Sequence, residues 1–233
     1  MSNVIAEIGL NHSGDLNLAK RLIKQSKDAG CWGVKFQYRD ITSFYQNKDE
    51  VGDVIIFDEI KKNFMPEEIL GQLAKFSKKL RINFGVSFFR VEDVYKLDGL
   101  LKFIDFFKIP SAECLNVRLL NELKKRNRKI FVSTGAHETN AVVTHLKDYK
   151  SEIILLHCIS NYPTEMGTQD LKAISYYKEN GFLNVGYSSH DSDWEVCLIA
   201  LSHGAEWIER HITLSREGNG LDDSSSSTLD DFI

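Results

Sequence analysis

The chain contains 233 residues, of which 42% are hydrophobic and 27% are charged. This balance is typical of a globular domain that buries a sizeable core. The formal net charge of −4 argues against general nucleic-acid binding, which needs an excess of basic side chains. Neither an apolar run of membrane-spanning length nor a secretory signal pattern occurs. We therefore expect no nucleic-acid partner and no membrane insertion.

The cysteines are few and widely spaced along the chain: Cys31, Cys114, Cys158 and Cys197. They form no Cys-x-x-Cys pair, so a zinc site or a disulfide framework is not indicated. This pattern is typical of reduced, buried thiols in a cytoplasmic protein.

Short β-rich runs recur along the whole chain, and amphipathic stretches separate them. Strands are expected at 4–9, 33–37, 83–88, 106–110, 130–135, 153–158, 184–189 and 207–212. Most of these runs are apolar almost throughout, as in parallel strands that are covered on both faces.

The segments between the strands have helical periodicity. Helices are expected at 16–29, 91–97, 116–124, 140–147, 170–177 and 192–201, with another that opens at 65–68. The first helix places Leu18, Leu22 and Ile23 on one face and ends before Gly30, a residue type favoured after a helix C-terminus. Pro66 suits the first turn of the helix that opens at 65–68.

Eight alternating strand–helix units predict a parallel sheet that closes into a (β/α)₈ (TIM) barrel, a single domain over residues 1–233. An open doubly wound sheet is the alternative, but no glycine-rich phosphate fingerprint follows the first strand. The polar interval 38–64 is expected to be an irregular loop on the catalytic side. Residues 224–227 are expected to form a flexible loop, and 227–232 the first turn of an eighth helix that is otherwise lacking.

Functional side chains of such barrels gather at the C-terminal ends of the strands. Two lysines would repel each other there unless an anion lay between them, and hydroxyl groups would complete an anion site. The residues that meet this description are Lys35, Lys108, Ser87, Ser111, Ser133 and Ser188. A Schiff-base aldolase that uses Lys35 or Lys108 is an alternative that the spacing leaves open.

Two histidines end neighbouring strands of the expected barrel, His190 on the seventh and His211 on the eighth. With carboxylates such as Glu209 and Asp222 nearby, this pair suits a divalent transition metal with open coordination positions. His137, His145 and His203 fall on expected helices or loops without a partner histidine, so no ligand role is expected for them.

Several sequence strings, one on nearly every strand, carry a family resemblance: VIAEIGLNHSGDLNLAKRLI, GVKFQ, FKIPSAE, VSTG, HCISNYP, GYSSHD, GAEWIERHITL and GNGLDDSSSSTLDDF. In this order, from residue 4 to 232, they resemble the catalytic domain of N-acetylneuraminate (sialic acid) synthases and of related nonulosonic-acid synthases. A (β/α)₈ barrel is the fold that this resemblance implies.

The resemblance also implies residue roles. Phosphoenolpyruvate is bound by Lys35, Ser87, Lys108, Ser111, Ser133, Ser160 and Ser188. His190 and His211 match the metal ligands, the metal being Mn²⁺ or alternatively Mg²⁺. The amino sugar faces Glu7, Glu113, Tyr162 and Asp222, and the acid–base candidates are Glu113, Glu7 and Glu209.

The implied reaction is a transfer that forms a carbon–carbon bond between phosphoenolpyruvate and the aldehyde of an N-acetylated amino sugar, such as N-acetylmannosamine. The metal polarises the aldehyde, C3 of phosphoenolpyruvate attacks it, and water adds at C2 before phosphate leaves. The expected partners are these small molecules and, by the same resemblance, a second copy in a homodimer.

Three departures from the family pattern bear on these expectations. Ser87 stands where threonine is common, and Ser189 stands where an aspartate usually precedes the histidine. The family also carries a small C-terminal antifreeze-like domain, to which no part of these residues corresponds. Besides the aldolase, a truncated barrel that binds phosphoenolpyruvate without catalysis is therefore an alternative.

Overall fold

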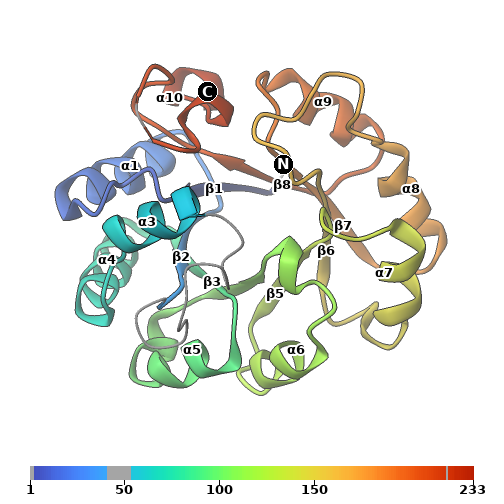
Figure 1. Ribbon diagram of the computed structural model, residues 1–233, viewed down its shortest axis with the longest axis horizontal. Helices are drawn as coiled ribbons and strands as arrows, with labels where there is room; N and C mark the ends of the chain where they lie inside the picture. Colours follow the sequence, from blue (N-terminus) through green and yellow to red (C-terminus); the bar gives the residue numbers. More distant parts are fainter. Residues whose placement is uncertain (1–2, 41–53, 219) are drawn as a thin grey trace.

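Eight parallel strands close into a barrel in the order β1 to β8, as the sequence predicts (Figure 1). The structure is a computed structural model and describes residues 3–40, 54–218 and 220–233. The strands are β1 (Asn3–Gly9), β2 (Gly33–Tyr38), β3 (Asn83–Phe88), β4 (Phe106–Ile109), β5 (Lys129–Ser133), β6 (Ile154–His157), β7 (Asn184–Ser189) and β8 (Trp207–His211).

The helices form an outer ring around this barrel (Figure 1). They are α1 (Leu16–Asp28), α3 (Val54–Lys62), α4 (Glu67–Leu80), α5 (Val91–Lys96), α6 (Val117–Lys124), α7 (Thr139–His145), α8 (Lys172–Glu179), α9 (Glu195–Ser202) and α10 (Leu229–Phe232). Within the described part of the chain, none of them is long and apolar enough to cross a membrane. All four cysteines are buried free thiols, as expected.

Large side chains fill the N-terminal end of the barrel. A compact cluster there consists of Ile5, Phe106, Phe131, Ile154, Leu156 and Trp207, all buried. Gly85 makes room for this cluster, because a Cβ atom at that position would lie 2.1 Å from the Phe106 ring. The functional side chains are therefore confined to the opposite, C-terminal end.

The strand register fixes which polar side chains meet at that end. Glu7 pairs with His211 across β1 and β8, and Ser188 pairs with Glu209 across β7 and β8. Residues two apart on one strand share a face, so Glu209 and His211 point into the barrel whereas Arg210 points out of it.

The interval 38–64 is not wholly irregular, because helix α3 (Val54–Lys62) lies within it. Ile60 of this helix is buried, and Lys61 and Lys62 lie in its last turn, where basic side chains are favourable. The expectation of a loop was wrong for this part, and residues 41–53 lie outside the described residues.

Residues 225–227 of the serine run are ordered and buried, so the expectation of a flexible loop was also wrong. Ser225, Ser226 and Ser227 are each at most 1% exposed. The Ser227 amide donates to the His211 carbonyl at 2.9 Å, and the Thr213 amide donates to the Ser227 carbonyl at 2.9 Å. The run thus continues the edge of β8, and α10 follows it as the expected single helical turn.

Candidate active site

A pocket opens at the C-terminal end of the barrel, where the sequence analysis placed the chemistry. Its lining consists of Glu7, Lys35, Gln37, Ser87, Phe89, Lys108, Pro110, Ser111, Ser133, Tyr162, Ser188, His190, Glu209 and His211. Most of the predicted site residues therefore share one cavity, although they come from strands spread over the whole chain.

Lys35 lies at the base of this pocket within a buried ion-pair network. Its Nζ atom is 2.7 Å from Glu7 Oε2 and 3.7 Å from Glu209 Oε2, and it donates a 2.8 Å hydrogen bond to Ser87 Oγ. Burial alone would lower the pKa of Lys35, but Glu209 and Glu7 outweigh it and raise that pKa. Lys35 is therefore held as an ammonium group.

Lys108 is the second buried lysine, and Glu209 is its counter-ion. Lys108 Nζ donates to Glu209 Oε1 at 2.6 Å, and Ser188 Oγ donates to the same oxygen at 2.8 Å. Burial lowers the pKa of Lys108, and Lys35 adds to this effect, although Glu209 opposes it. Burial also disfavours the Glu209 carboxylate, yet Lys108 and Lys35 hold its pKa well below the usual range.

Hydroxyl groups line the wall of the pocket next to Lys108. Ser111 Oγ accepts a 3.1 Å hydrogen bond from the Gly135 amide and lies 3.1 Å from Cys158 Sγ. Ser133 Oγ is buried without a hydrogen-bond partner among the described residues. Because a buried hydroxyl without a partner is costly, Ser133 is an available donor for a bound anion.

The two candidate metal ligands lie side by side at the rim of the pocket. The ring centroids of His190 and His211 are 5.8 Å apart, and the Tyr162 ring lies 4.0 Å from that of His190. Asp222 Oδ2 is 3.5 Å from His211 Nδ1. The His211 ring packs closely against the backbone of Gly9, which has a φ of +53°. A Cβ atom at this position would lie 3.2 Å from the His211 ring.

The chemistry of these donors fits a metal ion. His190 Nδ1 donates to the Ile159 carbonyl at 2.7 Å, which leaves the Nε2 lone pair free for a ligand. Burial, with a smaller contribution from His211, lowers the pKa of His190 to about 3, so the ring is neutral. Among the described residues no group of three or more His, Cys, Asp or Glu side chains is arranged around one metal position. The protein would thus offer two imidazoles and leave the other positions to water and substrate.

Glu113 and Ser160 do not line this pocket. Glu113 lies in a 3₁₀ turn (Ser111–Glu113), accepts a 2.7 Å hydrogen bond from Asn116, and lines a neighbouring pocket together with Phe89. Because successive residues of a 3₁₀ turn point about 120° apart, Ser111 faces the barrel pocket while Glu113 does not. Ser160 is exposed and lies beside Gly135, where a Cβ atom would be 2.6 Å from its Oγ.

Gln37 is a pocket residue to which the sequence analysis assigned no role. Its Nε2 atom donates to Glu7 Oε1 at 3.1 Å, so it orients the carboxylate that also pairs with Lys35. The alternation of side chains along a strand could have predicted this position, because Gln37 lies two residues after Lys35 on the same face of β2.

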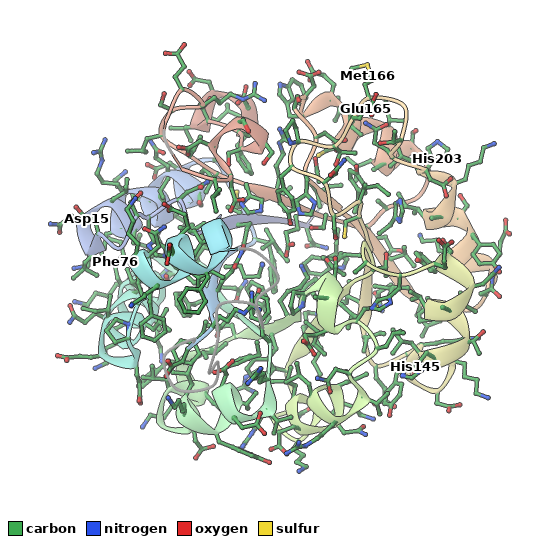
Figure 2. The ribbon with its side chains drawn as sticks, viewed as in Figure 1. Asp15, Phe76, His145, Glu165, Met166 and His203 are labelled. Atoms are coloured by element: carbon green, nitrogen blue, oxygen red, sulfur yellow. The ribbon has the colours of Figure 1, made fainter. Side chains whose placement is uncertain are left out.

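Two of the histidines for which no ligand role was expected, His145 and His203, lie away from the barrel axis. Figure 2 shows His145 and His203 in the outer ring of helices. His145 closes α7, where its Nε2 atom is 2.9 Å from the Leu115 carbonyl. Neither of them lines the pocket.

The chain is similar in sequence to proteins of known families. A model of the NeuB family matches residues 22–233. N,N'-diacetyllegionaminic acid synthase of Campylobacter jejuni is 34% identical over 96% of this chain and 71% of its own length. Human N-acetylneuraminate-9-phosphate synthase is 30% identical over 96% of this chain and 65% of its own length.

Solved structures give the same relationship. N-acetylneuraminic acid synthetase from Leptospira borgpetersenii, solved with citrate, superposes on this chain with a TM-score of 0.85 and is 33% identical in sequence. The match covers 99% of this chain and 80% of the synthetase chain. A truncated 3-deoxy-D-arabino-heptulosonate 7-phosphate synthase from Thermotoga maritima has a TM-score of 0.71 at 14% identity and covers 98% of this chain and 81% of its own, a likeness of fold alone.

Proposed function

Because this chain belongs to the NeuB family, we propose that it condenses phosphoenolpyruvate with an N-acetylated amino sugar to give a nonulosonic acid and phosphate. The reaction is a transfer that forms a carbon–carbon bond, and N-acetylmannosamine is the simplest acceptor. The observation that carries the proposal is one pocket that gathers two buried lysines, four serines and two histidines.

Phosphoenolpyruvate binds at the lysine end of this pocket. Lys35 and Lys108 supply the positive charge, and hydroxyl donors come from Ser87, Ser111, Ser133 and Ser188. Since Glu209 and Glu7 already neutralise both lysines, the anion competes with these carboxylates for the ammonium groups. The site therefore selects a ligand that carries more than one negative charge.

The amino sugar binds at the histidine end. His190 and His211 are the residues that would hold Mn²⁺, or Mg²⁺ in its place, and the neutral ring of His190 suits this role. When bound, the metal supplies Lewis-acid polarisation of the sugar aldehyde. Glu7, Tyr162 and Asp222 face the sugar, and the half-exposed Tyr162 ring packs against His190.

The bond changes require one proton acceptor and one proton donor from the chain. C3 of phosphoenolpyruvate forms the new bond to the aldehyde carbon, whose oxygen takes up a proton. Water then adds at C2 and loses a proton to a carboxylate, and the C2–O bond to phosphate breaks as the keto acid forms. Glu7 and Glu209, which line the pocket, are the candidates, and the two lysines keep Glu209 ionised.

A phosphate-release assay tests the proposal. The protein is incubated with phosphoenolpyruvate, Mn²⁺ and a panel of N-acetylated amino sugars, with omission of each component as the control. Release of phosphate that depends on the sugar and on the metal is the expected result. Binding of phosphoenolpyruvate in calorimetry without any phosphate release would instead indicate a barrel that binds this anion but does not catalyse the condensation.

One observation favours a second candidate, a Schiff-base aldolase. Burial lowers the pKa of Lys108, and a lowered pKa makes a lysine more nucleophilic. Against this, the Lys108 ammonium group donates at 2.6 Å to Glu209, which favours the charged form. The two functions differ in a covalent intermediate that can be trapped chemically.

A further inference from the structure

Arg210 is a buried cation directly behind the two histidines, with no part in the pocket lining. It is 3% exposed and points outward from β8, opposite in direction to Glu209 and His211. A buried guanidinium group needs hydrogen-bond acceptors and a counter-charge, because an uncompensated buried charge costs several kcal/mol by the usual order of magnitude. The hydrogen-bond acceptors of Arg210 therefore show which segments of the chain it connects.

The guanidinium group of Arg210 joins segments that belong to different parts of the chain. Its Nε atom donates to Ser227 Oγ in the serine run. Its Nη1 atom donates to Ser189 Oγ at 2.7 Å and to the Asp191 carbonyl at 3.1 Å, and its Nη2 atom donates to the Ser192 carbonyl at 3.4 Å. All three nitrogens of the planar group are used at once.

The counter-charge reaches Arg210 through Ser189. Ser189 Oγ accepts from Arg210 and donates at 2.7 Å to Asp191 Oδ2. The Asp191 carboxylate, 1% exposed, is fixed by further donors, the Tyr187 hydroxyl at 2.7 Å and the Gln169 amide at 3.0 Å. Ser189 is thus a bridge between a buried cation and a buried anion.

These contacts lie next to both candidate metal ligands in the chain. Ser189 and Asp191 flank His190, and Arg210 directly precedes His211. The side chain of Ser227 accepts the hydrogen bond from Arg210, and the backbone amide of Ser227 donates to the His211 carbonyl at 2.9 Å. The His190 carbonyl accepts from the Thr164 amide at 2.8 Å, so the backbone of both histidines is fixed.

We propose that Arg210, bridged by Ser189 to Asp191, is a positioning residue that fixes His190 and His211 relative to each other as metal ligands. The inference rests on the proposed function, because it presumes that the two histidines bind the metal. Lysine cannot replace this arginine, since one ammonium group cannot reach Ser227, Ser189 and the carbonyl groups of 191 and 192 together.

The test measures Mn²⁺ binding directly, by electron paramagnetic resonance of free Mn²⁺, in the wild type and in Arg210→Met, Arg210→Lys and Ser189→Ala. Loss of a residue that orients metal ligands usually weakens metal affinity by about 10- to 100-fold. We expect that range for both Arg210 variants and a smaller loss for Ser189→Ala. Phosphoenolpyruvate affinity, measured by calorimetry without metal, should stay within about two-fold, because Lys35 and Lys108 are untouched.

Arg216→Met is the matched control. Arg216 is partly exposed and donates to the same Ser192 carbonyl, but among the described residues it donates no hydrogen bond to Ser189 or Ser227. Its Mn²⁺ affinity should equal that of the wild type.

The outcomes separate this inference from the proposed function. If the wild type fails to bind Mn²⁺, the proposed metal centre is wrong. If the wild type binds Mn²⁺ and the Arg210 variants bind it equally or more tightly, the positioning role is wrong. Equal losses of Mn²⁺ and phosphoenolpyruvate affinity would indicate a general structural role and would also overturn it. Should the Arg210 variants fail to fold, Ser189→Ala decides by the same criteria.

Discussion

The carboxylate of Glu209 accepts a 2.6 Å hydrogen bond from Lys108 at the centre of the barrel, where both side chains are almost completely buried. Lys35 approaches the same carboxylate at 3.7 Å from the other side. A single carboxylate therefore partly neutralises two cations, and Glu7 supplies the second negative charge. The stability of the fold and, in the proposed function, the affinity for an anion therefore depend on the same four groups.

Replacing Glu209 by glutamine is expected to destabilise the protein strongly. The change leaves Lys108 without its counter-ion, and removing one partner of a buried ion pair usually costs about 3–5 kcal/mol of unfolding free energy. Urea denaturation at pH 7 measures it. The control is Asp28→Asn, which breaks the exposed pair with Lys24 and should cause no measurable change. Equal stability of the wild type and Glu209→Gln would contradict the charge balance described here.

His190→Ala and His211→Ala are each expected to abolish phosphate release that depends on Mn²⁺ while the protein stays folded. Each variant removes one of two imidazoles, and the remaining one cannot hold the metal alone. The assay is phosphate release over a range of Mn²⁺ concentrations, with circular dichroism to check folding. His203→Ala, in the outer helical ring (Figure 2), should keep full activity. Undiminished turnover in either pocket variant would exclude the metal assignment.

Borohydride reduction in the presence of pyruvate should leave the protein unmodified. A Schiff-base aldolase would gain the mass of a reduced pyruvate adduct on Lys35 or Lys108, whereas an ammonium group that only binds an anion would not. Mass spectrometry of the intact protein distinguishes the two.

Lys108→Met should weaken phosphoenolpyruvate binding by about 10- to 100-fold, since hydrogen bonds from a charged group contribute about 1.5–3 kcal/mol. Calorimetry measures this affinity. Lys102→Met, an exposed lysine on the preceding turn, serves as the control and should bind as the wild type does. An unchanged affinity in Lys108→Met would remove Lys108 from the anion site.

Asp93 should make the fold less stable as the pH rises from about 4 to about 7. This side chain is 1% exposed, and burial raises its pKa to about 7, with a further contribution from the Asp40 carboxylate. In the unfolded chain its pKa is about 3.9. Between these values the unfolded state loses the proton that the folded state keeps, so the unfolding free energy falls with increasing pH and then levels off.

Asp93→Asn should remove most of this dependence, because an amide stays neutral at every pH. Urea unfolding at pH 4.5 and at pH 8 measures it, and the variant should be more stable than the wild type at the higher pH. Asp98→Asn, at an exposed site on the next turn, should leave the slope unchanged. A wild type whose stability is the same at both pH values would refute the raised pKa.

The barrel and most of the pocket could be predicted because both depend on local patterns. Apolar runs bounded by turns locate the strands, and the rule that strand ends carry the chemistry brings Lys35, Ser87 and Lys108 together. The side chain that follows Lys35 by two positions, Gln37, could have been found by the same alternation.

Other features depend on partners that are distant in the sequence. A run of serines is typical of a flexible loop, whereas contacts with distant residues, such as those of Ser226 with Asn11 and of Ser227 with Arg210, hold it in an ordered conformation. The direction of Glu113 depends on a short 3₁₀ turn, for which no periodicity gives a signal. The role of Glu209 as a counter-ion also required the packing of three strands.

The hydrogen bond between Asn11 and Ser226 spans 215 positions of the chain, from just after the first strand to just after the last. During synthesis the first strand leaves the ribosome long before β8 and the serine run have been made. Until then Glu7 and Asn11 lack the contacts that they make with His211 and Ser226 in the folded barrel. The segment beside His211 thus gains these contacts only after Ser226 and Ser227 have been synthesised.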